Sequence, residues 1–156
     1  MDTEQLSIRP FRPADQCAAK ALILKGLEEH WGTLDPTLNP DLDDIATSYV
    51  DGTFFVATQS DRIVGTGALK LHGDGSGEVV RMSVATDCRR QGVGRRILDA
   101  LIEDGRARGL NRIILETTAT WQGAIAFYQA AGFTVTHHKD GDIYFVLPLW
   151  PDPEKA

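Results

Sequence analysis

The stretch Cys88–Leu98, CRRQGVGRRIL, places four arginines around two glycines, immediately before a pattern typical of a helix. The N-terminus of a helix carries unpaired N–H groups and the positive end of the helix dipole, so it attracts anions. Glycine lets an anion approach the backbone closely, and the forked guanidinium of arginine matches phosphate geometry. The stretch therefore predicts a binding site for a phosphate or a pyrophosphate.

Three phosphate-binding motifs match this stretch to different degrees. The P-loop needs G-x-x-x-x-G-K-[ST], a string that the sequence lacks. The dinucleotide fingerprint G-x-G-x-x-G follows the first strand of its fold, whereas this motif lies mid-chain and has Ile97 at the third glycine position. The pattern R-x-x-G-x-G at a strand-to-helix junction fits Arg89, Gly92 and Gly94.

Composition and charge narrow the class of protein. The chain has 156 residues, of which 42% are hydrophobic and 24% charged, as is typical of a globular domain. A net charge of -6 disfavours nucleic acid as the main partner and is compatible with a cationic substrate. The sequence has no membrane-length apolar run, no signal-peptide pattern and no metal-ligand spacing among its histidines and cysteines. We expect a cytoplasmic protein with no membrane, nucleic-acid or metal partner.

Hydrophobic periodicity and turn residues indicate the elements that position the arginine-glycine stretch. They predict one α/β domain over residues 1–156, with a frayed tail over 150–156. Strands are expected over residues 6–11, 53–59, 62–71, 78–85, 110–118, 133–138 and 142–149. Helices are expected over residues 12–32, 41–50, 92–109 and 121–132.

Three segments together resemble the GNAT superfamily, the GCN5-related N-acetyltransferases. RRQGVG resembles the family's cofactor motif Q/R-x-x-G-x-G/A, and EVVRMSVATDCRRQGVG resembles the strand and loop that precede it. AIAFYQAAGF resembles the family segment A-x-x-F-Y-x-x-x-G-F. The resemblance extends over residues 6–149 and implies the GNAT fold, an α/β fold with a mixed central sheet of about six to seven strands flanked by about four helices.

The resemblance implies acetyl-CoA as the acetyl donor. Backbone groups near Met82–Val84 would hold the pantetheine arm and polarise the acetyl carbonyl, because a strand that stops pairing leaves free N–H groups. Amides from Arg90 to Arg95 would cradle the pyrophosphate. The cofactor-binding residues expected on this basis are Met82, Ser83, Val84, Arg89, Arg90, Gln91, Gly92, Val93, Gly94, Arg95 and Trp121.

Two side chains are candidates for proton transfer. By resemblance, Glu78 occupies a place where several family members carry a general-base glutamate; otherwise it is an exposed carboxylate at a strand end, and water deprotonates the amine. By the same resemblance, Tyr128 lies near the cofactor sulfur. A phenol is a suitable general acid for a thiolate, and the alternative is that Tyr128 only packs on an apolar helix face.

Trp121 departs from the family pattern. Many members have asparagine three residues before the alanine of A-x-x-F-Y, and this chain has Trp121 there. Asparagine can hydrogen-bond the cofactor's arm, whereas indole only donates and otherwise stacks. Trp121 either packs on the cofactor or covers the core.

The acceptor side is less defined. Glu28, Glu29 and Trp31 end the first helix, and two carboxylates with an aromatic ring would bind an ammonium group. The alternative is a solvated helix end with Trp31 in the core. Arg81 faces the acceptor or pairs with a nearby acid.

These features predict an acetyl-CoA-dependent N-acetyltransferase. A primary amine, expected to be a small molecule, attacks the thioester directly in a ternary complex. Two alternatives stay open: acetylation of a protein amino group, and a non-catalytic sensor that binds acyl-CoA. A homodimer is also left open.

Overall fold

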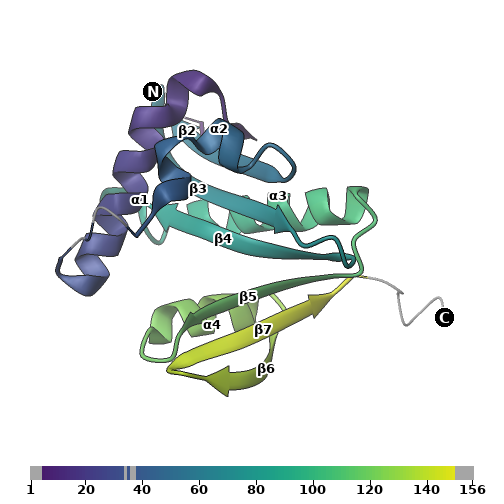
Figure 1. Ribbon diagram of the computed structural model, residues 1–156. Helices are drawn as coiled ribbons and strands as arrows, with labels where there is room; N and C mark the ends of the chain where they lie inside the picture. The colour runs from purple at the N-terminus through teal and green to yellow at the C-terminus, as the bar shows by residue number, and fades with distance from the viewer. Residues whose placement is uncertain (1–4, 34, 36–37, 150–156) are drawn as a thin grey trace.

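Seven strands form one mixed sheet in the order β1-β2-β3-β4-β5-β7-β6 (Figure 1). The computed structural model describes residues 5–33, 35 and 38–149, so the tail predicted to fray lies outside the described residues. Neighbouring strands are antiparallel except for β4 and β5, which run parallel. The strands are β1 Ser7–Pro10, β2 Thr53–Gln59, β3 Arg62–Leu71, β4 Ser76–Val84, β5 Arg112–Thr118, β6 Thr134–Lys139 and β7 Asp142–Pro148.

Helices pack against both faces of the sheet. Helices α1 and α2 lie on one face, and α3 lies on the other face together with α4, which covers β5 and β7 (Figure 1). The α-helices are α1 Gln16–Trp31, α2 Ile45–Ser48, α3 Val93–Ala107 and α4 Gln122–Ala130. Short 3-10 turns are η1 Pro13–Asp15, η2 Pro40–Asp43 and η3 Thr86–Cys88.

Helix α3 connects β4 to β5, as a parallel pair of strands requires. Its apolar stripe is buried: Ile97, Leu98 and Leu101 are inaccessible to solvent. A Cβ at Gly67 of β3 would lie 2.5 Å from Ile97 and 2.7 Å from the Met82 sulfur, so only glycine permits this packing. The helix that must present its N-terminus at the site is therefore held tightly against the sheet.

The structure differs from the sequence-based expectations at some boundaries. The helix expected over 41–50 is a 3-10 turn followed by the single turn α2, because Asp44 accepts a hydrogen bond from the Thr47 N–H and starts a new turn there. Strand β4 starts at Ser76 rather than at residue 78. The Ser76 N–H donates to Asp74, which ends the preceding glycine-rich turn earlier than expected.

Strands β4 and β5 separate along their length (Figure 1). Their described residues pair only over Ser76–Glu78 of β4 and Arg112–Ile114 of β5. Beyond this point β4 carries an irregularity opposite Thr66 and Ala68, where Arg81 has a φ of 59° and its carbonyl accepts a hydrogen bond from the Thr66 hydroxyl at 2.8 Å. The remaining length of β4 thus presents an edge without a strand partner on the β5 side.

Candidate active site

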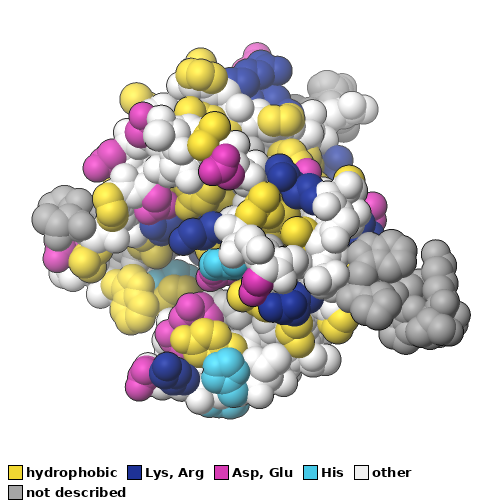
Figure 2. All heavy atoms as spheres, turned by 45° about the vertical axis from the view of Figure 1, so that its right-hand side comes forward, with side chains coloured by type: hydrophobic (Ala, Val, Ile, Leu, Met, Phe, Trp, Pro, Cys, Tyr) yellow, Lys and Arg dark blue, Asp and Glu magenta, His cyan; other side chains and the backbone are white. Residues whose placement is uncertain are grey.

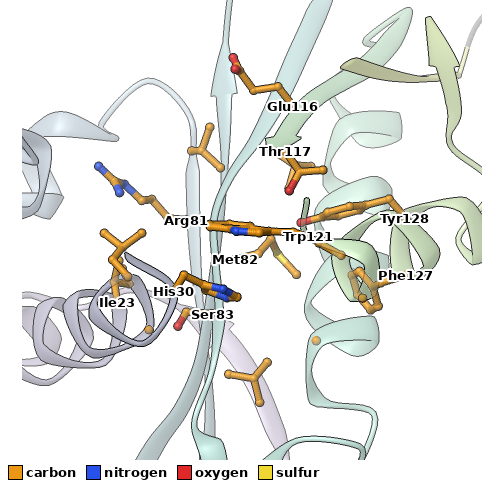
Figure 3. Close-up of a pocket in the computed structure, with 18 of the residues that line it drawn as sticks. Ile23, His30, Arg81, Met82, Ser83, Glu116, Thr117, Trp121, Phe127 and Tyr128 are labelled. Carbon is orange, nitrogen blue, oxygen red and sulfur yellow. The ribbon is translucent and has the colours of Figure 1, made fainter. Parts of the chain in front are cut away.

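A cavity of about 500 Å³ occupies the gap between β4 and β5. It is lined from both sides of the sheet, by α1 on one side and by α3 and α4 on the other (Figure 3). Six of the residues expected to bind the cofactor line it: Met82, Ser83, Val84, Arg89, Gly94 and Trp121. Arg90, Gln91, Gly92, Val93 and Arg95 lie outside the lining, in the loop and first turn of α3.

The N-terminus of α3 opens at one end of this cavity. Gly92 is the N-cap of α3 and has a φ of 84°; as a glycine it has no side chain that could cap the first turn. Arg90, two residues earlier, also has a positive φ, of 67°. The first amides of a helix have no acceptor within the helix. Val93, the first residue of α3, is 2% exposed and packs in the core, which holds this end of the helix against the sheet. This backbone geometry fits an anion.

The arginines around the glycines differ in what they bind. Arg89 donates to a Glu29 carboxylate oxygen at 2.9 Å and to the Val84 carbonyl at 3.2 Å. Arg95 pairs with Asp99 one turn along α3 at 3.0 Å. Arg90 is exposed and forms no hydrogen bond or ion pair with other described residues. Arg90 is thus the cation of the loop that remains available to a ligand.

The three residues predicted to bind an ammonium group at the end of α1 do not line this cavity. Glu29 is bound by Thr86 and Arg89, and these two hydrogen bonds lower the pKa of its carboxyl. Glu28 is exposed. Trp31 is 58% exposed, so the alternative that placed it in the core is wrong. The apolar stripe of α1 ends before its last residue.

Trp121 lies over the cavity rather than over the core. It precedes α4, and its ring stacks on His30 of α1 with centroids 4.0 Å apart. Trp31 is next to it, at 5.5 Å. The indole therefore joins the two sides of the gap. The sequence could not predict that His30 stacks on Trp121, because only the fold brings the C-terminus of α1 and the N-terminus of α4 together.

The ring and the hydroxyl of Tyr128 lie in different surroundings. Its ring packs against Phe133 and Phe145, and the residue is 9% exposed. Its hydroxyl points into the cavity (Figure 3). Burial raises the pKa of Tyr128 to about 12, so the phenol is protonated at neutral pH.

Glu78 lies in a second cavity, of about 460 Å³, on the α2 side of the sheet. The two cavities adjoin, because their linings share Val79, Val80, Arg81 and Glu116. Figure 2 shows the surface hollowed between its upper and lower parts, with acidic and histidine side chains beside the hollow. The Glu78 carboxylate is 2.8 Å from His72 Nε2. Glu78 is therefore a partly buried, hydrogen-bonded carboxylate.

Arg81 pairs with an acid, one of the two alternatives expected for it. Its guanidinium donates to both oxygens of Asp41, at 2.6 and 3.0 Å, and the Tyr49 hydroxyl donates to the same carboxylate at 2.6 Å. Burial alone would raise the pKa of Asp41, but the bonds from Arg81 and Tyr49 outweigh it and lower that pKa. The Arg81 charge is thus balanced within the protein.

Glu116 of β5 is a further acid of the site that sequence reasoning missed. It lines both cavities. Partial burial and the neighbouring carboxyls of Asp142 and Glu78 raise the pKa of Glu116. Only the parallel pairing of β4 and β5 could have placed it near Glu78.

The described residues include no group of three or more histidine, cysteine or acidic side chains that could hold a metal ion. No helix in the described ranges is long and apolar enough to cross a membrane.

A family model described as the acetyltransferase (GNAT) family matches residues 19–133. The chain belongs to this family. The seven-stranded mixed sheet and four α-helices confirm the predicted GNAT fold. Members of this family act on amine acceptors, and acetyl-CoA is the donor expected here.

Relatives of this GNAT protein carry acetyltransferase names. It is 35% identical over 113 residues to an "IAA acetyltransferase" of Azospirillum brasilense, covering 71% of this chain and 74% of the relative. It is 32% identical over 120 residues to rat N-acetyltransferase 8F1, covering 72% of this chain. The match spans only 52% of the rat protein, about half its length.

Solved structures share the fold. A GNAT-family acetyltransferase of Staphylococcus aureus Mu50 superposes with a TM-score of 0.85 at 22% identity, over 93% of this chain and 99% of that one. PaiA N-acetyltransferase of Thermoplasma acidophilum, solved in complex with coenzyme A, gives 0.82 at 15% identity over 93% and 99%. The residues of this GNAT protein fit coenzyme A: the uncapped α3 N-terminus suits a pyrophosphate, and the unpaired edge of β4 suits an amide-containing arm.

Proposed function

We propose that the protein transfers an acetyl group from acetyl-CoA to the primary amine of a small molecule, in a ternary complex. The observation that carries this proposal is the pair of adjoining cavities. One begins at the uncapped α3 N-terminus, and the other contains Glu78. A donor and an acceptor can therefore enter from opposite sides of the sheet and meet near Arg81 and Glu116.

Backbone groups serve the donor. The amides from Arg90 to Arg95 would bind the pyrophosphate, with the free Arg90 guanidinium beside them. The edge of β4 at Met82–Val84 would hold the arm and direct an N–H at the acetyl oxygen. Acetyl-CoA supplies a thioester whose C–S bond breaks as the amine nitrogen bonds to the carbonyl carbon.

Two side chains move protons in this proposal. Glu78 takes the proton that the amine loses, directly or through one water. Tyr128 donates its hydroxyl proton toward the sulfur, since a phenol with a pKa of about 12 is protonated at neutral pH. Trp121 and His30 cover the gap and exclude water from the reacting atoms.

The size of the Glu78 cavity supports a small acceptor. Its volume of about 460 Å³ lies within the range of small-molecule sites. Two carboxylates in its lining, Glu78 and Glu116, favour a cationic amine over an anionic one.

The test is release of the CoA thiol from acetyl-CoA with a panel of amines, amino acids, polyamines and peptides. We expect release with small amines, absent without an acceptor. Release with peptides alone would replace the small-molecule proposal by acetylation of protein amino groups. Tight acetyl-CoA binding without release from any acceptor would favour the sensor alternative.

A further inference from the structure

The turn between β3 and β4, His72–Gly75, is more firmly held than a simple hairpin connection. The His72 N–H donates to the Ser76 carbonyl at 3.1 Å, and Asp74 accepts from both the N–H and the hydroxyl of Ser76. The Asn111 N–H donates to the Gly75 carbonyl at 2.7 Å. The ring of His72 takes part in none of these bonds, so the turn does not depend on it.

The His72 ring instead contacts the proposed base. Its Nε2 lies 2.8 Å from Oε1 of Glu78, and the His72 side chain is the more exposed of the two, at 34% against 21%. Charged groups face the pair from both sides: Lys70 is opposite Glu78 on β3, and Glu116 approaches it from β5. The imidazole is therefore the more solvent-accessible member of the pair.

We propose that His72 is a positioning residue that passes the acceptor's proton from Glu78 to solvent. This inference rests on the proposed function, in which Glu78 is the base. As the N–C bond forms and the C–S bond breaks, the amine proton goes to Glu78. Once Glu78 is protonated, exchange with water gives the His72 tautomer that carries its hydrogen on Nδ1, and Glu78 passes its proton to the free Nε2. The imidazolium then loses the Nδ1 proton to water, which leaves Nε2–H donating to the Glu78 carboxylate. The pair returns to its starting charge without any further reactant.

The contact between Glu78 and His72 suits this proton transfer, called the relay below. A protonated Glu78 must lose its proton before the next turnover, and His72 offers that proton a more exposed exit than the carboxylate itself. Imidazole can accept a proton at one ring nitrogen and release one from the other. An amide at the same place can donate a hydrogen bond to Glu78 but cannot carry a proton.

The experiment compares His72→Ala and His72→Gln with the unmutated protein, using CoA thiol release with the best acceptor of the panel. We expect both variants to lower kcat about tenfold with KM unchanged, at the low end of general acid–base effects because His72 acts through Glu78. Added imidazole should restore kcat in His72→Ala. The matched control is His138→Gln, an exposed histidine on β6 that lines neither cavity.

The outcomes separate the relay from the proposed function. Full activity of His72→Gln, or no restoration of His72→Ala by imidazole, overturns the relay while the acetyltransferase proposal stands. In His72→Ala/Glu78→Gln, loss of the His72 effect and of the imidazole response supports a route through Glu78, and their persistence contradicts it. An absence of turnover in the unmutated protein overturns the proposed function and the relay together.

Discussion

The two ends of the joined cavities are built from different parts of the chain. The end proposed for the donor, the donor end, offers mainly backbone groups: an uncapped helix N-terminus and a strand edge without a strand partner among the described residues. The end proposed for the acceptor, the acceptor end, contains side-chain pairs, Arg81 with Asp41 and His72 with Glu78. The donor end should therefore tolerate most side-chain changes outside its glycines, whereas the acceptor end should depend on the identity of each side chain.

The largest effect that this comparison predicts is that of Glu78→Gln. Removing the base while keeping its shape should lower kcat about a thousandfold. Acetyl-CoA affinity should be unchanged, because Glu78 lies in the acceptor-side cavity. Steady-state kinetics and calorimetric titration measure the two quantities. Glu103→Gln, an exposed change on α3, is the control. Unchanged turnover across pH would show that water suffices as the base.

Gly92→Glu tests the donor end. A carboxylate at the α3 N-terminus would repel the pyrophosphate, and a side chain at a φ of 84° is strained, so we expect the Kd for CoA to rise about a hundredfold. Gly141→Glu is a close control. Its φ is 86°, a Cβ there meets nothing within 4 Å, and it lies in the β6–β7 turn. Equal affinity in the two variants would contradict the pyrophosphate cradle.

The same difference explains what the sequence could predict. Backbone sites leave local signatures, since glycines and a helix start must occur at fixed spacing. RRQGVG correctly predicted the α3 N-terminus, and its prediction of a pyrophosphate there stays a prediction. Strand boundaries followed from period and turn residues, and β2 and β3 agree at both ends.

Side-chain pairs leave no such signature. Asp41 and Arg81 are 40 residues apart in the sequence. His30 and Trp121 meet only because the last turn of α1 and the start of α4 lie on opposite sides of the gap between β4 and β5. Glu116 lies near Glu78 only because β4 and β5 pair in parallel.

Tyr128→Phe examines a donor-end contribution that depends on a single side-chain atom, the hydroxyl oxygen of Tyr128. The ring would keep its packing while the proton donor is lost, so kcat should fall about tenfold and thermal stability should stay the same. Because burial raises the pKa of Tyr128 to about 12, the unmutated enzyme should not lose activity through this group as the pH rises to about 10. A kcat equal to that of the unmutated protein would leave Tyr128 with a packing role only.

The smallest expected effect is on stability and concerns the ion pair between Arg81 and Asp41 at the acceptor end. Asp41→Asn leaves the half-buried Arg81 without its carboxylate, which should lower the free energy of unfolding at pH 7 by about 1 kcal/mol, a factor of roughly five in the folding equilibrium. The pKa of Asp41 is lowered in the folded state. Its stabilisation is therefore complete above the ordinary aspartate pKa and is lost as the pH falls through the lower, folded-state value.

The difference in unfolding free energy between the unmutated protein and Asp41→Asn should accordingly shrink as the pH falls below the ordinary aspartate pKa of about 3.9, and it should vanish below the folded-state pKa of Asp41. Asp43→Asn provides the comparison, because its pair with Lys20 is exposed and should contribute a few tenths of a kcal/mol at most. Equal losses in the two variants would mean that the Arg81–Asp41 pair is no more than a surface contact. In that case the side-chain identities at the acceptor end would matter for chemistry alone.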